Sequence, residues 1–145
     1  MTAVTAPSAA ARTLRPVWLV SVLAGIAAAV ATELYGLAAG AAGVPMAAGS
    51  IGASTAGSIG AGLFAFGVAV SVFWGTILAV LLHRYARGPA RTYLWTTIAL
   101  TAVSFAGPAF AGATATSTKL MLTGAHVLAA VIVIPVVTRR LAVRR

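Results

Sequence analysis

The sequence predicts an all-α membrane protein, a four-helix transmembrane up-down bundle with its N- and C-termini cytoplasmic. Hydrophobic residues form 61% of the 145 residues and charged residues only 8%, and the mean hydropathy is +1.03. A soluble domain carries about a quarter charged residues, so this chain lacks the polar surface of a water-soluble globule. Four apolar stretches, and basic residues placed at their edges, point to the same fold.

The predicted spans are four apolar stretches, at about 17–40, 60–82, 92–112 and 120–138. Each is close to the roughly 20 residues that a helix needs to cross the hydrocarbon core. Short connections make consecutive helices antiparallel neighbours. The chain therefore divides into a four-span domain and two short cytoplasmic tails, with the boundaries 1–15, 16–140 and 141–145.

The basic residues predict the orientation of the spans. Nine arginines lie before the first span, between the second and third, and after the fourth: Arg12, Arg15, Arg84, Arg87, Arg91, Arg139, Arg140, Arg144 and Arg145. Lys119 alone lies on the other side. Because cytoplasmic flanks collect Lys and Arg, the termini and the second connection are expected in the cytoplasm. The expected partners are the lipid bilayer and its anionic headgroups at that face, and not nucleic acid.

The first span has a second interpretation. Arg12 and Arg15, the apolar run after them and the segment 29–31 are similar to a cleavable signal peptide. Cleavage would leave three spans and would also satisfy the charge rule. The apolar run continues to Gly40, beyond the length of a typical signal, and this favours an uncleaved first helix.

The first connection, at about 41–59, consists almost wholly of Ala, Gly and Ser. Ordering a Gly-rich chain costs much conformational entropy. We therefore expect a flexible extracytoplasmic loop, with a re-entrant or lid segment as the alternative.

Small residues and prolines predict features of helix packing. In the second span Gly67, Ser71, Gly75 and Ala79 recur every four residues, which places them on one helix face. Such a face lets a neighbouring backbone approach closely, either within the bundle or across a homodimer. Kinks are expected near Gly107 and the two prolines inside spans, since proline removes one helical hydrogen bond; these are Pro108 and Pro135.

Glu33 is the only acidic residue of the chain, and it lies inside the first span. A carboxyl group in hydrocarbon usually faces the bundle interior and finds a partner. At 1.5 Å per residue, Glu33 lies ~10 Å from the outer end of the first span, and His126 lies ~9 Å from the outer end of the fourth. The two residues are therefore a candidate pair between the first and fourth helices. Three polar residues are expected near the same layer: Tyr35, Ser104 and Thr123.

Two roles follow for such a pair. As a structural element it fixes helix register, because polar pairs in bilayers contribute only about 0.6–2 kcal/mol but specify which helices meet. This makes the chain a structural or accessory membrane protein. Alternatively the pair is a protonatable site of a small proton-linked carrier or ligand-binding membrane protein, since histidine titrates near neutral pH.

Motifs of enzymes are absent from the sequence. It has no Walker loop, no HExxH and no GxSxG. The absence of Cys excludes disulfides and thiolate metal sites, and two His with one Glu do not make a conventional zinc site. We expect no catalytic residues, no metal and no cofactor.

Several segments of the second half resemble a known family. They are Trp95, Ser104–Pro108, Leu120–Leu122, Gly124–His126 and Val133–Pro135. With these segments the chain resembles the small four-helix bacterial membrane proteins catalogued as domain of unknown function 6069. The resemblance implies a multi-pass protein of the bacterial inner membrane. It implies no activity, because none is established for the family.

Overall fold

The structure, a computed structural model, describes residues 15–143. In this part of the chain four helical segments are long and apolar enough to cross a membrane. They are α1 (Val17–Ala41), α2 (Leu63–Tyr85), α3 (Pro89–Ser104) together with α4 (Ala106–Phe110), and α5 (Thr116–Ala142). The predicted all-α membrane fold with four spans is confirmed.

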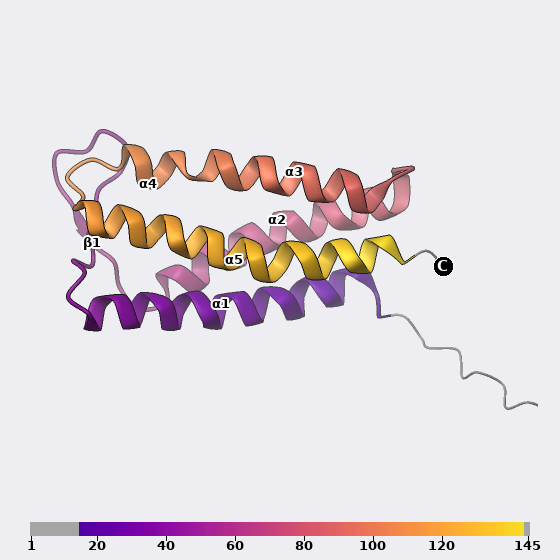
Figure 1. The fold of residues 1–145 in the computed structure, drawn as a ribbon, viewed down its shortest axis with the longest axis horizontal. Coiled ribbons are helices and arrows are strands. Elements are labelled where there is room, and N and C mark those ends of the chain that lie inside the picture. The colour runs from indigo at the N-terminus through magenta and orange to yellow at the C-terminus, as the bar shows by residue number, and fades with distance from the viewer. Residues whose placement is uncertain (1–14, 144–145) are drawn as a thin grey trace, which may run out of the picture.

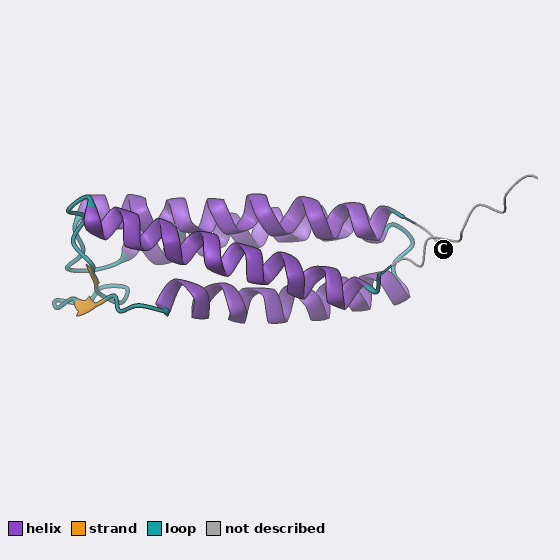
Figure 2. Ribbon diagram, turned by 90° about the horizontal axis from the view of Figure 1, so that it is seen from below, coloured by secondary structure: helices purple, strands orange, loops and turns teal. Residues whose placement is uncertain are grey.

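The spans lie lengthwise beside one another, and consecutive spans run in opposite directions (Figures 1 and 2). The start of α1, the α2–α3 turn and the end of α5 share one end of the bundle, which we call the arginine end. The described arginines belong to these segments: Arg15, Arg84, Arg87, Arg91, Arg139 and Arg140. Lys119 lies in the first turn of α5, at the opposite, loop end. The charges are thus separated along the bundle, as the positive-inside rule requires of a membrane protein.

The third span is interrupted close to Pro108. Helix α3 ends at Ser104 and α4 begins at Ala106. Because Pro108 has no N–H to donate to the carbonyl four residues earlier, the α-helical pattern breaks there. The N–H of Phe105 donates instead to the carbonyl of Ala102, at 3.3 Å. Pro135, by contrast, lies inside α5, which continues to Ala142.

A cluster of buried apolar residues, which we call the buried core, lies at the arginine end, and all four spans contribute to it. Its members are Val17, Ala79, Tyr93, Val137 and Leu141. Large apolar side chains elsewhere point outward on every span, among them Leu34, Phe73, Val103 and Val131. In water such a surface would cause aggregation, whereas in a bilayer it faces lipid.

Side chains of α2 pack closely against two glycines of α1. A Cβ at Gly25 would lie 2.6 Å from Cγ1 of Val72, and a Cβ at Gly36 would lie 2.6 Å from Cε2 of Phe64. Both glycines are buried. Close helix approach at small residues is the usual way in which membrane helices pack, so α1 and α2 meet through these two contacts.

We expect Gly25→Ala to lower the free energy of unfolding by about 1–3 kcal/mol, the usual cost of overpacking. The β-branched side chain of Val72 has few alternative rotamers with which to move aside. Unfolding in mixed detergent–SDS micelles measures the change, and Gly67→Ala is the matched control because a Cβ there meets nothing within 4 Å. Adding Val72→Ala should restore the lost stability. A Gly25→Ala variant as stable as the wild type would contradict this contact.

The first connection is folded, which differs from the flexible loop favoured by its composition. Strands β1 (Ala47–Ala48) and β2 (Gly57–Ser58) form a small antiparallel hairpin. The segment also binds the connection between α4 and α5: the N–H of Gly49 donates to Oγ1 of Thr114 at 2.9 Å, and the N–H of Gly112 donates to the carbonyl of Ser50 at 3.0 Å. Hydrogen bonds between two closely approaching backbones replace the missing side-chain packing.

Candidate functional site

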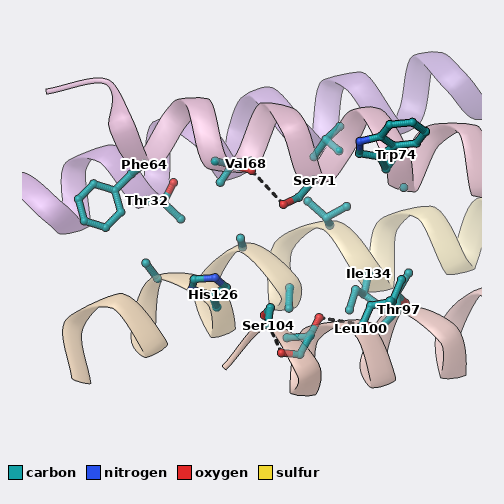
Figure 3. Close-up of a pocket in the computed structure, with 18 of the residues that line it drawn as sticks. Thr32, Phe64, Val68, Ser71, Trp74, Thr97, Leu100, Ser104, His126 and Ile134 are labelled. Carbon is teal, nitrogen blue, oxygen red and sulfur yellow. Dashed lines mark hydrogen bonds between the residues drawn. The ribbon is translucent and has the colours of Figure 1, made fainter. Parts of the chain in front are cut away.

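A half-open cavity of about 620 Å³ lies between the helices of the bundle. Residues of α1, α2, α3 and α5 line it, and most of them are apolar. Its volume is within the range of about 300–1,000 Å³ that is typical of small-molecule sites. The polar lining residues include Thr101 and five residues that Figure 3 labels: Thr32, Ser71, Thr97, Ser104 and His126.

The cavity is long in the direction of the helices. Its lining on α5 runs from Leu122 to Ile134, which is ~18 Å of helix at 1.5 Å per residue. Tyr93, a member of the buried core, lines the part nearest the arginine end. An elongated apolar molecule matches this shape better than a compact polar one does.

His126 is the one ionisable nitrogen base that lines the cavity. Its Nδ1 lies 2.7 Å from the carbonyl oxygen of Leu122, one turn earlier in α5. Since a carbonyl oxygen only accepts hydrogen bonds, Nδ1 carries the proton in this bond, and Nε2 of the neutral ring is an acceptor. Phe105 holds the ring edge-to-face, with 6.4 Å between ring centroids and an angle of 76°.

Most hydroxyl groups around the cavity donate to their own helix. Thr32 donates to the carbonyl of Ala28 at 2.8 Å, Ser71 to Gly67 at 2.9 Å, and Ser104 to Thr101 at 2.7 Å. Their oxygen lone pairs stay available as acceptors. Among the described lining residues Thr76 differs, because its hydroxyl oxygen is buried without a hydrogen-bond partner. The wall therefore offers mainly acceptors to a bound molecule.

The predicted pair of Glu33 and His126 does not form, although α1 and α5 do pack side by side. The carboxylate of Glu33 instead accepts two backbone N–H groups at the start of α2, from Gly62 at 2.6 Å and from Ala65 at 3.1 Å. The first N–H groups of a helix have no partner within it, and its N-terminus attracts negative charge. Glu33 thus caps a neighbouring helix, and its depth in the bilayer was no guide to its partner.

The other predicted site residues separate into two groups. Ser104 lines the cavity together with His126, whereas Tyr35 and Thr123 do not. Tyr35 of α1 packs against α5, where a Cβ at Gly124 would lie 2.5 Å from its hydroxyl oxygen. Thr123 donates to the carbonyl of Lys119 at 2.9 Å.

The small residues of α2 also line the cavity. Gly67, Ser71 and Gly75 all face it. A Cβ at Gly67 meets nothing within 4 Å, and one at Gly75 would reach only the hydroxyl of Tyr93 at 3.7 Å. Along this stripe only Ala79 is fully buried in the core. Within the bundle the stripe therefore makes space for the cavity, while its role across a homodimer stays a prediction. Gly107 also lies in open space, and Pro108 is buried.

Sequence reasoning missed Thr97 and Thr101 of α3. Together with the predicted Ser104 they are spaced by three or four residues, and all three line the cavity. This is the helical spacing of one face, and such a run of hydroxyls in an apolar span was a usable signal. Trp74 and Thr32 also line the cavity, and nothing in their sequence context indicates it.

The structure shows no group of three or more His, Cys, Asp or Glu that could hold a metal ion among residues 15–143. No curated protein and no solved structure matches the chain. A family model does match, over residues 12–143 and thus over nearly the whole sequence. The chain therefore belongs to the family of unknown function DUF6069.

Proposed function

We propose that this membrane protein binds a small, elongated and largely apolar molecule inside its helix bundle. The cavity of about 620 Å³ carries the proposal, because its lining is apolar over most of its area and comes from four helices. This is the ligand-binding alternative, with His126 alone as its polar centre in place of a Glu33–His126 pair. The role is binding, without catalysis.

The polar contacts indicate what kind of molecule fits. Nε2 of His126 accepts a hydrogen bond when Nδ1 donates to Leu122. The described residues that line the cavity include no Asp, Glu, Lys or Arg, so the wall offers no charged group to a ligand apart from the imidazole of His126 when it is protonated. A lipid-soluble alcohol or phenol satisfies both conditions, since it brings one O–H donor and an apolar body. Such a molecule would enter from the hydrocarbon phase, with the arginine end on the cytoplasmic side of a bacterial inner membrane.

Fluorescence quenching of Trp74 tests the proposal, because this side chain lines the cavity. The two other tryptophans, Trp18 and Trp95, are replaced by Phe, and the protein is placed in phosphatidylcholine nanodiscs. A bromoalkylphenol is the probe, and its methyl ether is the analogue without a donor. We expect saturable quenching by the phenol, and binding of the ether about two- to tenfold weaker, as expected for one lost hydrogen bond.

Two pairs of variants separate the cavity from the surrounding lipid. Gly67→Leu fills the cavity and should weaken phenol binding by about tenfold or more; Ala69→Leu, on an exposed position of the same helix outside the lining, should leave it unchanged. His126→Phe should make phenol and ether bind alike. Equal quenching in both leucine variants would show that the probe reaches Trp74 from the lipid and would overturn the proposal.

A further inference from the structure

Arg140 is buried at the arginine end, with only 8% of its surface exposed. Its Nε–H donates to the backbone carbonyl of Arg15, at 2.6 Å. Within residues 15–143, both terminal nitrogens of the guanidinium are buried and have no hydrogen-bond partner. A buried cation costs several kcal/mol unless it is paired, so this guanidinium needs an anion.

The chain has no side chain that can supply this anion. Glu33 is its single acidic residue, and both oxygens of that carboxylate bind the start of α2. Glu33 also lies sixteen residues after Val17 in α1, or ~24 Å along the helix, towards the loop end. Since no side chain can supply the anion, we look for the partner of Arg140 in another molecule.

The N-terminus of α1 lies beside Arg140, since the hydrogen bond to Arg15 joins the two segments. This helix has no side-chain cap and no acidic residue in its first turn. The leading N–H groups of a helix lack partners within it, and together with the helix dipole they favour an anion. The uncapped start of a 25-residue helix and a buried guanidinium thus converge on one place.

We propose that Arg140 and the N-terminus of α1 form a binding site for a phosphate group, supplied by an anionic phospholipid headgroup. A guanidinium binds phosphate oxygens through parallel N–H contacts, a geometry in which arginine exceeds lysine. The site lies where four apolar spans end in arginines, which is the level of the headgroups. The lipid bound here would also tie the first and last helices together at their ends.

Binding of dioctanoyl phosphatidic acid to the full-length protein in detergent tests the site. Dioctanoylglycerol is the matched control, because it lacks only the phosphate. We expect phosphatidic acid, and not dioctanoylglycerol, to raise the Tm of the wild type through mass action. The absence of this difference would overturn the proposal without any variant. Inorganic phosphate forms a third arm: a Tm rise or competition at similar concentration would support the phosphate site and assign it to a soluble phosphate source.

Substitutions then locate the site. Arg140→Gln should weaken phosphatidic acid binding by about tenfold or more, as expected for lost charge-assisted hydrogen bonds. Arg139→Gln removes the same charge from the exposed neighbouring position and should change binding less than about twofold. Arg140→Lys keeps the charge and the fold but should also bind more weakly. An equal loss in the Arg139 and Arg140 variants would show general surface attraction and would contradict a built site.

Discussion

Replacing Glu33 with Ala is expected to lower the free energy of unfolding by about 2–4 kcal/mol, from two lost charge-assisted hydrogen bonds and the lost helix-dipole interaction. The side chain joins the loop-side half of α1 to the start of α2. Without it, the N–H groups of Gly62 and Ala65 lose their acceptor. Glu33→Gln should cost about half as much, since an amide has one acceptor oxygen in place of two. Unfolding in mixed detergent–SDS micelles measures both values.

A double-mutant cycle with His126→Ala distinguishes this role from an ion pair. If Glu33 caps α2, the effects of the two substitutions should add within about 0.5 kcal/mol, because the residues have different partners. A paired Glu and His would instead give a coupling energy above that limit. Leu34→Ala is the control for loss of side-chain volume in α1, because Leu34 follows Glu33 directly and its side chain is exposed.

Gly112→Ala should release the first connection from the bundle. A Cβ at this position would lie 2.2 Å from the carbonyl oxygen and 2.5 Å from the nitrogen of Ala53. Backbone atoms cannot rotate away as a side chain can, so the two connections must separate. The cost is about 2–4 kcal/mol if three or four hydrogen bonds between them are lost. The spans themselves should stay intact, because their contacts lie elsewhere.

Hydrogen–deuterium exchange measures this effect directly. In the Gly112→Ala variant, amides of residues 47–53 should exchange much faster than in the wild type, while those of α5 keep their protection. Gly60→Ala is the matched control in the same segment, since a Cβ there meets nothing within 4 Å. Unchanged exchange of residues 47–53 in Gly112→Ala would contradict the close approach of the two connections.

The sequence predicted most of the fold and about half of the site. The spans, their number and the gathering of arginines at one end agree with the structure. His126 and Ser104 line the cavity, but Glu33, Tyr35 and Thr123 do not. Depth arithmetic gave Glu33 and His126 the same level in the bundle. It could not give the direction in which each side chain points around its helix, and that direction decides the partner.

The first connection shows a second limit of sequence reasoning. Its Ala, Gly and Ser content predicts a flexible chain, because such residues gain little from burial. The structure orders it through two hydrogen bonds: the N–H of Gly49 donates to the hydroxyl of Thr114, and the N–H of Gly112 donates to the carbonyl of Ser50. Every residue except proline carries a backbone donor and acceptor, so no local pattern in the sequence predicts which of them will pair across the bundle.

The sequence by itself determined that this chain spans a membrane four times and collects its basic residues at one end. The partitioning of a segment between water and the bilayer depends on the hydropathy and charge of its own residues, and it can be predicted without knowing their tertiary contacts. Only the tertiary structure decided that Glu33 caps α2, that small and hydroxyl-bearing residues surround a cavity, and that Arg140 is buried beside the start of α1. Each of these depends on the rotation and contact of separate helices, and the packing of the whole bundle sets them.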